Sequence, residues 1–258
     1  MKVKSFFAAS LLVAGAAFAD STTVETEYVL GVMPVSVGSG QQDVILSIPW
    51  VEAGSNSEGV AVSNLVKTAG LTTGDTLLWY DGSKYQAWAI DSTTNWTPTV
   101  ISEVSGLADS IAATTTDLNR GQALVLHRQG TSEGKVYVVG QYLKGTTSST
   151  IASGSYKAPK YSLIAPTSTS GVNLNTALAG VSKTEGDEVS FVNSSGQFKT
   201  YSYHITNDTG AWGTWSLDLT GSFPRAVFTP VVESSNMDLP AGTGFYYKRC
   251  GEQASVTW

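Results

Sequence analysis

The chain has 258 residues, of which 14% are charged, with a formal net charge of −6, 26 glycines and one cysteine. This acidic balance argues against nucleic acid as a partner, because phosphate binding needs clustered Lys and Arg side chains. The single cysteine, Cys250, excludes an intramolecular disulfide, so the fold must be stabilised by burial of a core.

The first 19 residues predict a secretory signal peptide. Lys2 and Lys4 supply a positive end, residues 6–18 form an apolar run, and Ala17-Phe18-Ala19 places small residues at a cleavage position. The run is shorter than the roughly 20 residues of a membrane-spanning helix, and no other such run follows. We therefore expect an exported protein without a transmembrane helix. Its expected location is the cell surface, the outer membrane or the medium, with the periplasm as an alternative.

The next predicted elements are a short helix and a β-hairpin. The stretch VSNLVKTAG at 62–70 places Ser63 ahead of apolar residues and closes on a glycine, which is typical of a short capped helix. The stretch LTTGDTLLWYDGSKYQAW at 71–88 alternates apolar and polar residues at a period close to two. Asp81-Gly82 within it suits a tight turn, so the stretch predicts two antiparallel strands.

These blocks return later in the chain in the same order. SKTEGDEVSFVNSSGQFKTY at 182–201 repeats the hairpin, and LNTALAG at 174–180, capped by Asn173, repeats the helix. LNRGQALVLHRQG at 118–130 returns without a gap as LPAGTGFYYKRCG at 239–251. A unit of roughly 110 to 120 residues, an ordinary domain size, has therefore been duplicated. We expect unit 1 at 20–134 and unit 2 at 135–258, with a Ser/Thr/Gly-rich connector at 144–160.

The predicted fold class is all-β. Abundant Gly, Thr, Val, Tyr and Ser, with turn residues at short intervals, is typical of sandwiches and barrels. We expect two homologous antiparallel units, sandwich-like or barrel-like, each with at most one short helix.

The repeated motifs carry a resemblance. SLIAP, GDEVSFVNSSGQFKTYSY, AW and LPAGTGFYYKR, in this order in the second half, resemble a duplicated β-repeat of uncharacterised exported, surface-associated bacterial proteins. The first half departs from the motif, since Ala123-Leu124-Val125 stands where Gly244-Phe245-Tyr246 stands in the second. The resemblance implies a β architecture and a surface location, and it implies no catalytic residues.

Residues that could carry chemistry do not form a recognisable constellation. Asp75 and Asp187 follow glycine in both halves, which favours turn aspartates that bind their own backbone over a calcium site or catalytic pair. His127 and His204 fall at non-equivalent repeat positions and belong to no metal-binding motif. Cys250 is interpreted as a packing residue. We therefore expect no catalytic residue, metal or cofactor, and a non-enzymatic protein.

Aromatic residues are the one suggestive feature, because flat amphipathic rings either stack on sugars and interfaces or fill a core. Trp79 matches Phe191 and Trp88 matches Tyr201 in the repeat, which favours the core for both tryptophans. If a ligand face exists, the candidates are the aromatics of the two hairpins and their following strands: Trp88, Trp96, Tyr201, Tyr203, Trp212 and Trp215.

These observations together predict a cell-envelope or surface protein with a structural, adhesive or assembly role. Its expected partners are a surface glycan, another envelope protein or a second copy of itself. A glycan-binding module that uses the six aromatics, an enzyme of unknown class and a small outer-membrane β-barrel are the alternatives. The terminal Trp258 with Val256 and Ala254 imitates the end of a membrane barrel, but Glu252 breaks the alternation.

Overall fold

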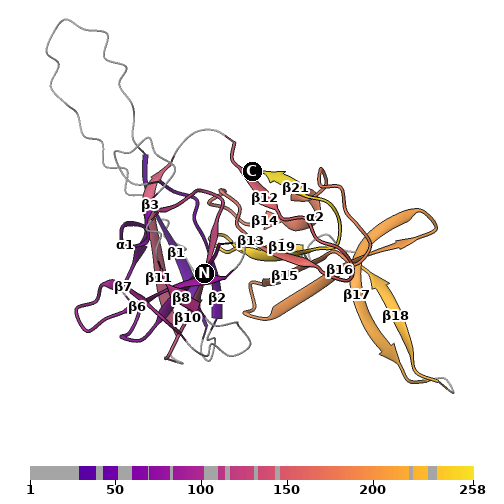
Figure 1. Ribbon diagram of the computed structural model, residues 1–258, viewed down its shortest axis with the longest axis horizontal. Helices are drawn as coiled ribbons and strands as arrows, with labels where there is room; N and C mark the ends of the chain where they lie inside the picture. The colour runs from indigo at the N-terminus through magenta and orange to yellow at the C-terminus, as the bar shows by residue number, and fades with distance from the viewer. Residues whose placement is uncertain are drawn as a thin grey trace, which may run out of the picture.

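The computed structural model confirms the all-β class (Figure 1). It describes residues 29–38, 43–51, 60–68, 70–81, 84–101, 110–113, 117–130, 133–142, 146–220, 223–231 and 237–258. The predicted signal peptide lies outside the described residues. No helix within them is long and apolar enough to cross a membrane.

The first half contains eleven strands and one helical turn among its described residues. They are β1 (Val29–Val37), β2 (Asp43–Ser47), β3 (Val60–Ala61), α1 (Val62–Leu65), β4 (Val66–Lys67), β5 (Thr76–Tyr80), β6 (Tyr85–Ile90), β7 (Trp96–Thr99), β8 (Ser110–Ala112), β9 (Asp117–Leu118), β10 (Ala123–His127) and β11 (Gly134–Tyr142).

The second half repeats this order with small differences. Its elements are β12 (Ser148–Ile151), β13 (Lys160–Ile164), β14 (Val172–Asn173), α2 (Leu174–Ala177), β15 (Glu188–Val192), β16 (Phe198–Thr206), β17 (Thr209–Asp218), β18 (Arg225–Pro230), β19 (Asp238–Leu239), β20 (Phe245–Arg249) and β21 (Ala254–Thr257).

Most strand pairings are the same in the two halves. The main sheet runs β2-β10-β5-β6-β7 in the first half and β13-β20-β15-β16-β17 in the second. The small pair β3-β9 likewise corresponds to β14-β19, and β1-β11 corresponds to β12-β21. The second sheet continues into β18, and the first half adds β4 beside β11 and β8 beside β6. Both sheets are open, as in a sandwich.

The register of the strands agrees with the alignment of the repeats. Trp88 lies opposite Leu77, as Tyr201 lies opposite Val189. Alternate residues of a strand point to opposite faces, so equal register places matched residues on equal faces. The aromatics matched between the halves therefore occupy matched positions.

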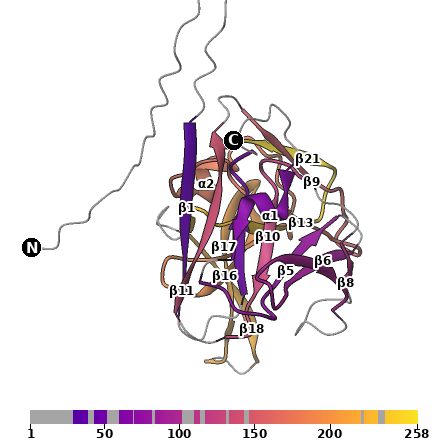
Figure 2. The same ribbon diagram turned by 90° about the vertical axis from the view of Figure 1, so that its left-hand side faces the viewer.

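The position of β11 differs from the expected boundary at Gly134. β11 begins at Gly134 and pairs over nine residues with β1, side by side with it in Figure 2. By pairing, β11 is thus a strand of the first unit, and the second unit begins with β12. The expected connector at 144–160 contains β12 and ends at the first residue of β13.

The two short helices were predicted at 62–70 and 174–180 and are single turns. Asn173 is the N-cap of α2 and accepts a hydrogen bond from the Thr176 backbone nitrogen, as expected. Ala61, and not Ser63, is the N-cap of α1. An α-helix of one turn has little stability of its own, so both turns depend on packing of their first apolar residue. These residues, Val62 and Leu174, are buried.

The halves meet along a seam with approximate two-fold symmetry. The Ser47 nitrogen donates to the Gly242 carbonyl at 2.8 Å, and the corresponding Ala165 nitrogen donates to the Gly121 carbonyl at 3.0 Å. Gly121 and Gly242 occupy the same place in the duplicated motif and have φ values of 82° and 79°. This backbone conformation favours glycine, because a Cβ atom would be strained there. The repeated stretch thus builds both sides of the contact between the units.

Near the centre of the seam, equivalent residues face each other. Ala123 and Gly244 occupy matching positions, and a Cβ atom placed on Gly244 would lie 2.8 Å from the Ala123 Cβ. Real Cβ atoms do not approach this closely, and the same Cβ atom would lie 2.8 Å from the Ile164 carbonyl oxygen, so position 244 has no room for a methyl group. Close packing across the seam therefore requires glycine at position 244, whereas the equivalent position 123 holds a buried alanine.

Candidate functional site

The structure does not bring the six predicted aromatics together. Trp88 and Trp96 lie in the core of the first half, while Tyr201, Tyr203 and Trp212 pack in the core of the second. Their exposed fractions are 3% for Trp88, 9% for Trp96, 7% for Tyr201 and 4% for Trp212. Each points to the inner face of its sheet, where a large ring contributes most to stability. Trp88, Trp96, Tyr201 and Trp212 therefore cannot offer a ring face to a ligand without unfolding, whereas Tyr203 is partly buried.

Trp215 is the exception, with 48% of its surface exposed. It lies on β17 three residues after Trp212, and strand alternation therefore turns it to the outer face. Its ring centroid lies 4.9 Å from that of His204 on β16 and 5.2 Å from that of Phe228 on β18. Three adjacent strands thus contribute one ring each to an outer ring cluster of His204, Trp215 and Phe228.

His204 is held in this cluster by Glu185. The Nδ1 atom of His204 lies 2.8 Å from Glu185 Oε1, and the Ile205 nitrogen donates to Glu185 Oε2 at 2.7 Å. Partial burial acts to raise the pKa of Glu185, but the bonds from His204 and Ile205 and the His204 charge lower it overall. The carboxylate form therefore orients the imidazole ring against Trp215.

Apolar exposure continues along the β17–β18 hairpin, which projects away from the rest of the molecule (Figure 1). Leu217, on the same face as Trp215, is 62% exposed. Leu219 and Phe223, beyond the end of β17, are 67% and 83% exposed. Asp218 and Arg225 close the hairpin with an ion pair at 3.0 Å. We call Trp215, Leu217, Leu219, Phe223 and Phe228 the hairpin surface.

The duplicated aspartates are buried structural groups. Asp75 accepts hydrogen bonds from the backbone nitrogens of Thr72 at 2.9 Å and Gln129 at 2.8 Å. Asp187 accepts the equivalent bonds from Thr184 at 3.0 Å and Cys250 at 2.7 Å. Both side chains are fully buried. The turn interpretation therefore describes the geometry of both carboxylates.

Each aspartate also has an arginine beside it, which sequence reasoning did not anticipate. Arg249 Nη1 lies 2.6 Å from Asp187 Oδ2, and Arg128 Nε lies 4.0 Å from Asp75 Oδ2. The sequence contained a signal of this pairing, because the aspartate and the arginine of each pair both recur in the duplicated blocks. A buried charge that recurs requires a recurring partner.

The remaining reactive groups also have structural surroundings. Burial raises the pKa of the Cys250 thiol, whose Sγ donates to the Gly186 carbonyl at 3.2 Å. His127 Nδ1 lies 2.8 Å from Asp43 Oδ1 at the end of the β2–β10 pair. Within the described ranges, no group of three His, Cys, Asp or Glu residues could hold a metal ion.

Comparison of the chain with protein-family models, curated proteins and solved structures finds no match.

Proposed function

We propose that this is a non-enzymatic, exported surface or envelope protein with a structural, adhesive or assembly role, and that the hairpin surface binds its protein partner. The observation that carries the proposal is the apolar outer face of a hairpin that projects from a folded body. An exposed apolar patch costs solubility, and in folded proteins such patches mark sites of protein contact.

The composition of the surface favours protein over carbohydrate as the partner. The Trp215 ring is tilted by 64° against His204 and by 57° against Phe228, so the three rings form a ridge. Sugar stacking would favour a flat platform, whereas a ridge with leucines beside it suits an apolar groove in a protein. Aromatic residues are enriched in the centres of protein interfaces.

The edge of the sheet adds a second means of attachment. β18 is the last strand of its sheet, and its pairing is with β17. An edge strand presents backbone groups that can pair with a strand of another chain. A partner strand added beside β18 would lie against Phe228 and extend the apolar contact.

The test replaces two exposed residues with serine, as Trp215→Ser with Leu217→Ser. The matched control is Leu30→Ser with Val32→Ser on β1, which are 58% and 62% exposed. We measure binding of purified protein to the producing cells and self-association by sedimentation. The hairpin variant should lose at least tenfold in binding, and the control should bind like the original protein.

Thermal unfolding distinguishes loss of binding from loss of fold. Both variants should unfold near the temperature of the original protein, because all four residues are exposed. The proposal is wrong if the original protein neither binds cells nor self-associates, or if the control loses as much binding as the hairpin variant.

A further inference from the structure

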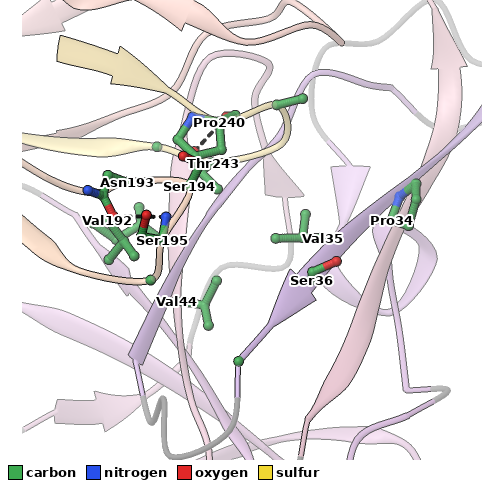
Figure 3. A pocket seen from close by; sticks show the side chains of 15 residues that line it. Pro34, Val35, Ser36, Val44, Val192, Asn193, Ser194, Ser195, Pro240 and Thr243 are labelled. Carbon is green, nitrogen blue, oxygen red and sulfur yellow. Dashed lines mark hydrogen bonds between the residues drawn. The ribbon is translucent and has the colours of Figure 1, made fainter. Parts of the chain in front are cut away.

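The seam between the halves forms a cavity of about 420 Å³ that is open to solvent and separate from the hairpin surface (Figure 3). The first half contributes residues of β1 and β2, such as Val35 and Ile45, and the second contributes the β15–β16 turn at 193–196 and the segment before β20. This volume is within the range of roughly 300 to 1,000 Å³ that is usual for small-molecule sites.

The seam departs from two-fold symmetry at a pair of tyrosines. On one side of the seam, Tyr85 and Tyr246 fill the space between the sheets, and their hydroxyl oxygens lie 3.3 Å apart. By strand register, the counterparts of these tyrosines are Phe198 and Val125. Val125 is much smaller than Tyr246, and Phe198 is 62% exposed. The second side of the seam therefore lacks an equivalent pair of rings.

The lining is neutral and carries several hydrogen-bonding groups. None of the described residues that line the cavity is charged. Ser36, Ser194 and Ser195 contribute hydroxyl groups, as Figure 3 shows for Ser36 and Ser195. Asn193 Oδ1 accepts hydrogen bonds from the Ser195 and Gln197 nitrogens at 3.0 and 2.9 Å. These bonds fix the Asn193 side chain in the turn that lines the cavity.

Apolar groups alternate with these polar ones. Pro34, Val35, Val44 and Pro240 form the apolar part of the lining. Val192 also lines the cavity, and its directly paired neighbour on β16 is Phe198. Paired residues in antiparallel strands share a face at a Cβ distance of about 5 Å, so the Phe198 ring stands beside the rim. An exposed aromatic ring is thus next to a neutral polar cavity.

We infer that this cavity binds a neutral carbohydrate, with Phe198 stacking on one face of a sugar ring at the rim. A sugar offers hydroxyl groups to the serines and Asn193, and C–H faces to the prolines and Phe198. An anionic ligand is disfavoured because the described residues of the lining include no cation to offset its desolvation. This inference does not depend on the hairpin surface.

The test uses the original protein with a glycan array and calorimetric titration of four neutral disaccharides, namely cellobiose, maltose, lactose and mannobiose. The array holds neutral, sialylated and uronic-acid glycans. Binding should be confined to neutral glycans. Phe198→Ala should weaken it about tenfold, and Trp215→Ala, which removes an exposed ring elsewhere, should leave it unchanged.

A second variant blocks the cavity from an exposed turn. Ser194→Trp places an indole over the opening and should reduce binding at least tenfold, whereas Lys84→Trp in the corresponding turn of the first unit should not. An array without a neutral ligand overturns the inference. A preference for acidic glycans would also overturn the inference. Binding that survives both Phe198→Ala and Ser194→Trp would overturn it as well. Retained cell binding in these variants would leave the function of the hairpin surface intact.

Discussion

The two buried aspartates occupy the same place in the two units, but they are bound differently. Asp187 accepts a hydrogen bond from Arg249 at 2.6 Å and another from the Tyr247 hydroxyl at 2.9 Å. In the first unit Leu126 stands in place of Tyr247, and the nearest contact between Asp75 and Arg128 is 4.0 Å. The two units therefore share one topology but stabilise the equivalent buried carboxylate with different partners.

The comparison shows how a buried carboxylate can be tolerated at the start of a strand, since Asp75 and Asp187 directly precede β5 and β15. Backbone nitrogens bind the aspartate in both units, so the turn geometry alone supplies part of the stabilisation. The second unit adds an ion pair and a phenol, and burial together with the Asp187 charge raises the pKa of Tyr247. Hydrogen bonds to charged groups are stronger than neutral ones, and more of them should make Asp187 the more costly residue to remove.

Removal of the carboxylates is the largest expected effect. Asp187→Ala leaves Arg249, only 3% exposed, without its ion-pair partner and should lower the free energy of unfolding by about 3–5 kcal/mol. Asp75→Ala should cost about 1–3 kcal/mol, mainly through its unpaired backbone nitrogens. Urea unfolding of both variants measures the difference. An equal or larger loss for Asp75→Ala would show that the arginine contact does not distinguish the two units.

The facing pair at the centre of the seam gives the next largest effect. Gly244→Ala places a Cβ atom 2.8 Å from that of Ala123 and should destabilise the protein by about 1–3 kcal/mol through overpacking. Adding Ala123→Gly should restore only part of the loss, because the new methyl group would still lie 2.8 Å from the Ile164 carbonyl oxygen. Urea unfolding of the single and double variants forms a double-mutant cycle. Additive losses would contradict direct contact between the two positions.

The smallest effect concerns the turns that follow the hairpin strands. The second unit connects β16 to β17 through Asn207 and Asp208, both with positive φ, whereas the first unit uses a longer turn built around Asp91. The hydrogen bond from Thr93 is the largest cause that lowers the pKa of Asp91, to about 2. The lowered pKa means that this carboxylate stabilises the fold above its ordinary pKa of 3.8, and the contribution is lost as the pH falls through about 2.

An NMR titration of the Asp91 carboxyl carbon measures the lowered pKa of this side chain. Thr93→Val should shift the midpoint upward toward the ordinary value, while the global stability at neutral pH should change little because the turn is exposed. A midpoint near 3.8 in the original protein would rule out the arrangement of donors around Asp91.

Local patterns anticipated much of the fold. Alternation and turn residues predicted the hairpins, and the match of Trp88 with Tyr201 agrees with the observed register. The N-cap at Asn173 could also be predicted from local sequence, because its hydrogen-bond partner is only three residues away. The candidate site was harder to predict. Strand alternation places Trp212 and Trp215 on opposite faces, but it does not say which face the core will cover.

The sequence by itself determined that the chain is all-β, that a unit of one topology occurs twice, and where the main hairpins turn, because these depend on periods and residues close together along the chain. Only the tertiary structure decided that Trp212 is buried while Trp215 is exposed, that Asp75 and Asp187 lie beside arginines, and that the halves meet at Ala123 and Gly244. Such contacts join residues more than 50 positions apart, as Asp187 and Arg249 are. They depend on how two sheets stack, which no local pattern records.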